Sequence, residues 1–278
     1  MSTLRLFLAC GLALLASRPI AALAHLGSPF GDVLSALQDA RIVALVEAVE
    51  ETRDTSGGAR TEVRPLAVWS GRLPKRLAIL QPPPHIHRHR AGDVFVVPLD
   101  ERVGDAYPCA LETATPLAAK REEATALAAL VRWARALPRP TPPGVRMATL
   151  LRELERSGRT SLGRRITLEM LVGQVDEARA ALDSAGRQTL LSAIADGDQT
   201  EAYRLGLVRA AALLADGDVL RGLCGALPRL HSVAVRSATF DALAVSGGAC
   251  FRAALDRCRA DAQDPLQRRC ETLWGRLD

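Results

Sequence analysis

One segment recurs along the second half of the chain at a nearly fixed spacing. It reads RRITLEML from Arg164, RLGLVRAA from Arg204, RSATFDAL from Arg236 and RRCETLWG from Arg268, with steps of 40, 32 and 32 residues. Around these copies, Ala, Leu and Arg follow helical spacing. A helical unit repeated at a fixed period buries its apolar face by stacking on its neighbours. We therefore expect residues 145–278 to form an all-α solenoid.

The copy at residues 235–244, VRSATFDALA, is similar to the pattern VRxxAxxALG of HEAT proteins. This resemblance to HEAT-like repeats implies helices stacked into a curved rod. The usual use of such a rod is to bind another protein. It therefore implies a protein partner, whose identity the sequence leaves open.

The joints between two of these helices share the sequence ADGD, at residues 195–198 and 215–218. Gly197 and Gly217 are suited to the left-handed conformation that ends a helix. Asp198 and Asp218 would then cap the helices that follow. A calcium loop is the alternative, but the further ligands and closing Glu of an EF-hand are missing from the sequence.

The first half has the pattern of a β domain, which we place at residues 25–112. Strands are expected at 41–51, 61–69, 76–80 and 94–99, after one or two helical turns at 32–40. The first strand is apolar enough to be buried on both faces. Pro65 in the second strand indicates an edge or a bulge. Short strands between Gly and Pro clusters are typical of a small barrel or sandwich.

Four stretches carry a resemblance for this half: DARIVALVEAV, TEVRPLAVWSG, AGDVFVVPL and CALETATPLA. In this order they are similar to the netrin-like, or tissue-inhibitor-of-metalloproteinases-like, OB-fold domains of secreted bacterial proteins. Family members often pair the cysteine of the last stretch with one near the mature N-terminus, and this sequence has no cysteine between residues 25 and 108. The resemblance therefore implies an OB-like β-barrel and nothing further.

Residues 113–144 connect the two halves. Leu127, Leu130, Val131, Ala134 and Leu137 form one apolar stripe and predict a helix. The proline-rich stretch PRPTPPG at 138–144 then ends that helix.

Residues 1–24 have the features of a signal peptide. Arg5 precedes a short apolar run, and Ala22-Leu23-Ala24 fits a cleavage site, so the mature chain would begin at His25. This predicts a periplasmic or secreted protein with no transmembrane segment in the mature chain. The formal net charge is +5, but the basic residues form no block or tail. This distribution and export both argue against nucleic acid as a partner.

An exported chain permits disulfides, and five cysteines follow residue 25. Cys258 and Cys270 lie six residues on either side of Asp264, where AQDP should turn one helix into the next. Residues equidistant from a helical turn are neighbours, so we predict a Cys258–Cys270 disulfide. Cys224 and Cys250 are a second candidate pair between repeats.

Three histidines, His85, His87 and His89, alternate within PPPHIHRHRAGD. One interpretation is a solvated loop. The other is a copper or zinc site completed by His25, because imidazole is the commonest ligand for such metals. Arg88 and Arg90 would repel a cation, so we favour the loop and expect no bound metal.

The sequence contains no G-x-S-x-G, P-loop, H-E-x-x-H or C-x-x-C motif. We therefore expect no catalytic residues, no cofactor and no enzyme activity. The predicted function is that of an exported, non-catalytic binding or scaffold protein of the cell envelope. The alternatives are a periplasmic copper- or zinc-binding protein that uses His25 and residues 85–89, and an uncharacterised hydrolase.

Overall fold

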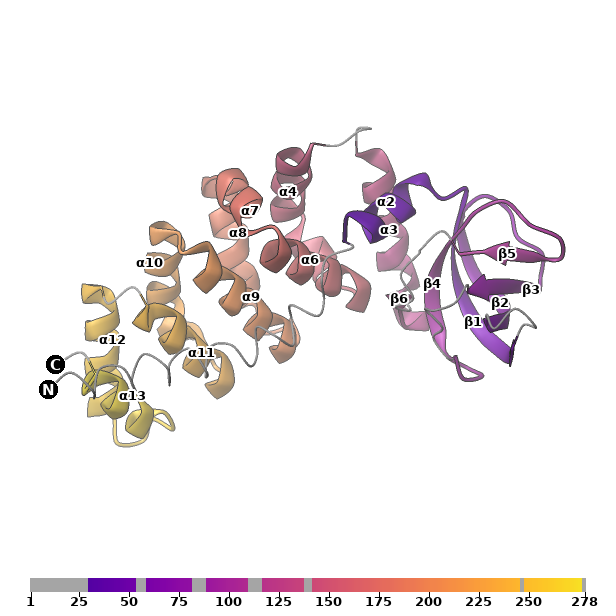
Figure 1. The fold of residues 1–278 in the computed structure, drawn as a ribbon. Coiled ribbons are helices and arrows are strands. Elements are labelled where there is room, and N and C mark those ends of the chain that lie inside the picture. Colours follow the sequence, from indigo (N-terminus) through magenta and orange to yellow (C-terminus); the bar gives the residue numbers. More distant parts are fainter. Residues whose placement is uncertain are drawn as a thin grey trace, which may run out of the picture.

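The computed structural model describes residues 30–53, 59–81, 89–109, 117–137, 142–245 and 248–276. Figure 1 shows a β-sheet at one end of the molecule and a row of helices that leads away from it. The predicted signal peptide, His25, His85 and His87 lie outside these ranges. The predicted order, a β region followed by a helical region, is confirmed.

The sheet is mixed and has six described strands in the order β5-β3-β2-β1-β4-β6. Four of them match the predicted strands: β1 (Ile42–Arg53), β2 (Ala59–Ser70), β3 (Leu77–Gln81) and β4 (Val94–Leu99). The other two, β5 (Ala106–Pro108) and β6 (Leu117–Ala118), are too short to show an apolar period. Because β6 pairs with β4, the sheet extends into residues that the sequence assigned to the connection.

Strand β1 is buried on both faces, as its apolar sequence predicted. Ile42, Ala44, Val46 and Ala48 point into a core within the sheet domain, together with residues such as Phe95. The alternate residues Val43 and Leu45 belong to a second core that they share with the helices. Successive side chains of a strand face opposite sides, so one strand serves both cores.

The β1–β2 pair confirms the bulge expected at Pro65. The register shifts between Leu45 and Val46, which oppose Ala67 and Pro65. Proline lacks the N–H that a ladder needs, so it is confined to edges and bulges. The ladder between β2 and β3 covers only Ala59–Val63 of β2. Among the described residues, the rest of β2 pairs with β1 alone.

Strands β3 and β5 run parallel, whereas the other pairs are antiparallel. An isolated bridge joins Leu99 at the end of β4 to Cys109, the residue that follows β5. Nearby, the Asp100 N–H donates to the Pro108 carbonyl at 3.3 Å. Within the described residues the ladder between β4 and β5 goes no further, so the sheet curves back on itself but does not close.

Helices make up most of the remaining described chain. They are α2 (Phe30–Asp39), α3 (Ala124–Ala136), α4 (Pro143–Arg152), α5 (Leu154–Ser157), α6 (Ser161–Gly173), α7 (Val175–Ala181), α8 (Ser184–Ala195), α9 (Glu201–Leu214), α10 (Gly217–Ala226), α11 (Val233–Ala244), α12 (Ala249–Ala260) and α13 (Gln267–Trp274), with 3₁₀ turns η1 (Arg121–Glu123) and η2 (Leu227–Arg229). None of the helices in this part of the chain is long and apolar enough to cross a membrane.

The helices from α4 onward contact one another in a regular order. Helix α8 contacts α10, and α10 contacts α12. In the same way, α6 contacts α9, and α9 contacts α11. Consecutive helices such as α8 and α9, or α10 and α11, join the two series (Figure 1). Two layers result, in which each helix packs mainly on near neighbours along the chain.

The sheet and the helices share one apolar core. Helix α2 packs against α3 and α6, and α3 also contacts β2. Arg135 on α3 donates through Nη1 to the Ala40 carbonyl at 2.9 Å. The Glu123 carboxylate accepts the Ser161 N–H at 3.0 Å, at the start of α6. These contacts fix α2 and α3 between the sheet and the helical layers.

Both helix joints differ from the caps predicted for them. At the first, Thr200 and not Asp198 is the N-cap of α9, and Gly197 does not take the left-handed conformation. The second joint differs in which aspartate forms the cap. Asp216, not Asp218, is the N-cap of α10, and its carboxylate accepts the Asp218 and Val219 N–H groups at 3.0 Å each. The left-handed residue is Ala215, with φ 49°, while Gly217 is the first residue of the helix. Arg187 on α8 forms two hydrogen bonds to the Asp216 carboxylate and lies farther, at 3.8 Å, from that of Asp218.

Gly163 allows the closest helix approach at the start of α6. A Cβ at this position would lie 2.1 Å from the backbone oxygen of Ser157, which is well inside van der Waals contact. At Gly173, at the other end of the same helix, a Cβ would meet nothing within 4 Å. The two glycines therefore form a matched pair.

We predict that Gly163→Ala destabilises the fold by about 2–3 kcal/mol, because a backbone atom must move to relieve the overlap. Gly173→Ala should be neutral or stabilising by up to about 1 kcal/mol, since alanine restricts the unfolded chain. Urea unfolding of both variants measures the difference. Equal stabilities would contradict the close approach of α5 and α6.

Candidate functional site

The histidine-rich stretch enters the described structure at His89. Its side chain is only 7% exposed, and its ring stacks on Phe95 with the centroids 4.0 Å apart and the planes within 10°. Its backbone N–H donates to the Glu51 carboxylate. The prediction of a solvated loop is therefore wrong for His89, because the turn before β4 folds its ring onto Phe95.

An open groove of about 570 Å³ lies beside His89, where β4 begins and β6 leads into η1. Backbone bonds shape it: the Gly92 N–H donates to Ala48, and the Ala119 N–H donates to Val94. Gly92 has φ 93°, a conformation that favours glycine. The lining residues are His89, Gly92, Asp93, Val94, Phe95, Ala118, Ala119, Lys120, Arg121 and Glu122.

The groove is lined by two acidic residues, Asp93 and Glu122, and two basic residues, Lys120 and Arg121. Arg64 and Arg121 both bind the Glu47 carboxylate. The hydrogen bond from Arg64 lowers the pKa of Glu47 below its usual value; burial opposes this effect and Arg121 adds to it. Asp93 accepts the Arg90 N–H at 2.7 Å. The groove thus offers hydrogen bonds to a polar ligand without a concentration of charge of one sign.

Of the four proposed metal ligands, only His89 is described. Within the described ranges, no three His, Cys, Asp or Glu side chains lie close enough to hold a metal ion. The ring that contacts His89 is that of Phe95, which is not a metal ligand, and the Glu51 carboxylate accepts the backbone N–H of His89. A site that includes His25, His85 and His87 stays a prediction.

A group of hydroxyls lies where α5, α6 and α9 meet. The Ser157 and Thr167 oxygens are 2.8 Å apart, and burial raises the pKa of the neighbouring Tyr203 above its usual value. All three side chains are at most 2% exposed. No substrate can reach a group enclosed in this way, so we assign it to the core.

Ion pairs cross between helices at the exposed ends of the layers. Arg187 on α8 forms two hydrogen bonds to Asp216, at 3.0 and 2.8 Å, and these hold the pKa of Asp216 at about 2. Arg269 on α13 binds Asp241 on α11. These pairs tie α8 to the start of α10 and α13 to α11, and we interpret them as supporting contacts.

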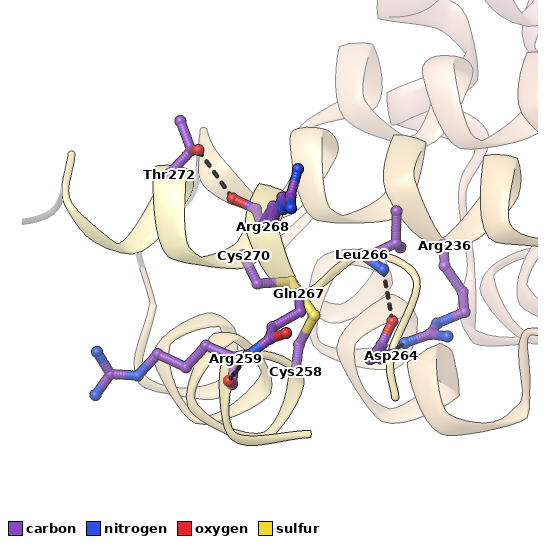
Figure 2. Close-up of a disulfide and its surroundings, with 9 residues drawn as sticks. All are labelled: Arg236, Cys258, Arg259, Asp264, Leu266, Gln267, Arg268, Cys270 and Thr272. Atoms are coloured by element: carbon purple, nitrogen blue, oxygen red, sulfur yellow. Dashed lines mark hydrogen bonds and ion pairs between the residues drawn. A yellow bond between two sulfur atoms is a disulfide. The ribbon is translucent and has the colours of Figure 1, made fainter. Parts of the chain in front are cut away.

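The predicted cysteine neighbours lie together. Figure 2 shows Cys258 on α12 and Cys270 on α13 joined, with Asp264 in the turn between them. Their sulfurs are 2.14 Å apart and their Cα atoms 6.1 Å apart. Asp264 binds Arg236 on α11, and Arg259 lies over the Trp274 ring at 4.1 Å. Cys224 on α10 and Cys250 on α12 form the second pair at disulfide distance.

Sequence reasoning missed the His89–Phe95 stack and the Glu47 ion pairs. The first had a local signal, because the turn residues Gly92 and Asp93 stand between the two rings. The second had none, since Glu47, Arg64 and Arg121 meet only after β1, β2 and η1 are in place.

Comparisons with protein-family models, with curated proteins and with solved structures find no match to this chain. Its function must therefore be inferred from its own residues.

One carboxyl of the helical region is largely withdrawn from water. The Glu169 side chain is 11% exposed, and one of its oxygens accepts from Arg165 at 3.2 Å. Its other oxygen is buried and has no hydrogen-bond partner among the described residues. Burial raises the pKa of Glu169 to about 7, although Arg165 acts in the opposite direction.

We predict that Glu169→Gln stabilises the fold at pH 8 more than at pH 5. A raised pKa means that the folded state binds the proton of Glu169 more tightly than the unfolded state does. The stability that this protonation contributes is present below pH 4.5 and is lost as the pH rises to about 7. Glutamine stays neutral and avoids the loss. Melting temperatures at both pH values test this, with the exposed Glu122→Gln as control. If Glu169→Gln raised the melting temperature equally at both pH values, the raised pKa of a buried Glu169 carboxyl would be contradicted.

A second prediction concerns His89. Replacing His89 with Gln should cost about 1 kcal/mol, because stacked ring pairs contribute roughly 0.5–1.5 kcal/mol. Replacing the exposed His231 with Gln is the matched control and should be neutral. Neither wild type nor variant should melt at a higher temperature when copper or zinc is added. A metal-dependent shift that disappears in His89→Gln would instead support the metal-binding alternative.

Proposed function

We propose that this protein is an exported, non-catalytic binding or scaffold protein of the cell envelope. In this proposal, a HEAT-like solenoid of helices α4–α13 presents its surface to a protein partner. One observation carries it: each helix packs mainly on near neighbours along the chain, in two layers. The outward faces of both layers then form long surfaces for a partner.

The positions of the recurring arginines support a repeating unit. Arg164, Arg204 and Arg236 are each the fourth residue of their helices, α6, α9 and α11. These helices are successive members of one layer. The steps of 40 and 32 residues between these arginines are compatible with one unit per step along the stack, while Arg268 of the fourth copy is the second residue of α13.

Two of these arginines also have similar contacts, whereas Arg236 binds the Asp264 carboxylate. Arg164 donates through Nε to the Gly158 carbonyl, and Arg204 donates through Nε to the Ile194 carbonyl, each at 2.7 Å. Gly158 is the C-cap of α5, and Ile194 lies in the last turn of α8. Each carbonyl is therefore at the C-terminal end of the helix that precedes the arginine's own helix. A side chain that satisfies such carbonyls in successive units is expected of a repeated architecture.

The pairing of the strands supports an OB-like barrel for the sheet domain. Strand β1 pairs with both β2 and β4, and β3 pairs in parallel with β5. The bridge from Leu99 to Cys109 brings β4 toward β5. An OB-fold is a five-stranded, partly open barrel, and this arrangement is compatible with it. In the proposal, the barrel supports the helical stack at one end.

Export is supported by the cysteines. Two pairs at disulfide distance indicate an oxidising compartment, such as the periplasm or the exterior of the cell. Cleavage before His25 remains a prediction from the sequence, since residues 1–24 lie outside the described structure.

The proposal predicts that a partner cross-links from one face of the helical stack. A photo-reactive amino acid would replace Gln188 on α8 or Ala253 on α12, which are exposed on one layer. It would replace Ala202 on α9 or Ala234 on α11 for the other layer. After irradiation of intact cells, we expect both positions of one layer to yield the same adduct by mass spectrometry.

The matched control is Val103, which is 63% exposed in the sheet domain and should give no such adduct. Melting temperatures must be unchanged in all variants, so that altered folding is excluded. Adducts from Val103 alone, or from no helical position, would contradict the proposal that the helices form the binding surface.

A further inference from the structure

The two disulfides differ in how accessible they are. We propose that Cys224–Cys250 is a redox-responsive bond, which an exported dithiol oxidoreductase opens while Cys258–Cys270 stays closed. Opening it would free the hairpin of α12 and α13 from α10 and leave the hairpin itself intact. This inference does not depend on the binding function proposed above.

Access favours attack on the first bond. Cys250 is exposed in the first turn of α12, although its partner Cys224 is only 1% exposed. Cys258 and Cys270 are 5% and 0% exposed, and α12 and α13 pack on either side of their bond (Figure 2). Thiol–disulfide exchange requires a thiolate to reach a sulfur atom. A bulky reductant thus meets the Cys250 sulfur before it meets Cys258 or Cys270.

The helix termini act alike on the two bonds and do not set the order. Cys250 is the second residue of α12, a helix of 12 residues, so the N–H groups of the first turn stabilise its thiolate. Cys270 likewise lies in the first turn of α13. Cys224 and Cys258 lie in the last turns of α10 and α12, where the carbonyl groups disfavour a negative charge. Exposure sets the order, because exposed disulfides have more oxidising potentials than buried ones and are reduced first.

The exchange takes place in two steps. A thiolate of the dithiol attacks Cys250 Sγ, forms a mixed disulfide and releases Cys224 as a thiolate, which takes a proton from water. The second thiolate of the dithiol then attacks the dithiol's other sulfur in the mixed disulfide, and Cys250 leaves as a thiolate. Two electrons pass to the protein bond, and the dithiol leaves as a disulfide.

Among the described residues, two ion pairs join the hairpin to the rest of the stack besides this bond. Asp264 binds Arg236, and Arg269 binds Asp241, and both pairs join the hairpin to α11. Phe251 and Leu255 contribute apolar contacts from α12. These non-covalent interactions can open and form again, so the hairpin can leave the stack and return to it. Cys224–Cys250 is the bond that joins α12 covalently to α10.

The test is a redox titration of the oxidised full chain. The protein is equilibrated with dithiothreitol buffers of stepped potential and then quenched in acid. Maleimide alkylation and peptide mapping follow. We expect Cys224 and Cys250 to be alkylated at a more oxidising potential than Cys258 and Cys270. Hydrogen exchange of α12 and α13 amides should then become roughly a hundredfold faster, the effect of removing one loop constraint.

Two double variants provide a matched comparison. Cys224→Ser with Cys250→Ser should reproduce the fast exchange in α12 and α13 without reductant. Cys258→Ser with Cys270→Ser should still show reduction of the remaining pair at the same potential as in wild type. Reduction of both bonds in one step, or of Cys258–Cys270 first, would overturn the proposal. So would unchanged exchange in α12 and α13 after Cys224–Cys250 opens, and this wild-type measurement requires no variant to fold.

Discussion

The burial of β1 on both faces is the constraint on which the rest of the structure depends. Ile42, Ala44 and Val46 fill the core of the sheet domain, while Val43 and Leu45 join the core shared with the helices. That shared core continues through the helical layers to Leu273 near the end of the chain. Water would gain access to a large apolar surface if sheet and helices separated, so burial holds them together.

Polar contacts then set how the helices are offset. Arginines on one helix bind the cap or the turn of another, as Arg187 does at Asp216 and Arg236 does at Asp264. Such bonds are directional, unlike apolar contacts, and they favour one register of the stack. At the far end no further helix pair covers α12 and α13 among the described residues. The two cysteine pairs lie there, where a stack of helices is least supported.

The sequence predicted a large part of this fold. The four long strands, the stripe on α3 and the bulge at Pro65 all follow from local apolar periods or from the chemistry of proline. It did not predict β5 and β6, because two or three residues show no period. The candidate site was less predictable. His89 was expected in a solvated loop, and its burial depends on Phe95, which belongs to the next strand.

The sequence by itself determined what depends on neighbours along the chain. The helices, the main strands and the approach of Cys258 to Cys270 about Asp264 belong to this class, because a short turn leaves few arrangements. Only the tertiary structure decided which aspartate caps α10, where Glu47 finds its arginines, and that Cys224 lies beside Cys250. Each of these contacts joins residues from separate helices or strands. Their distance is set by the packing of whole elements, and no local pattern of residues records it.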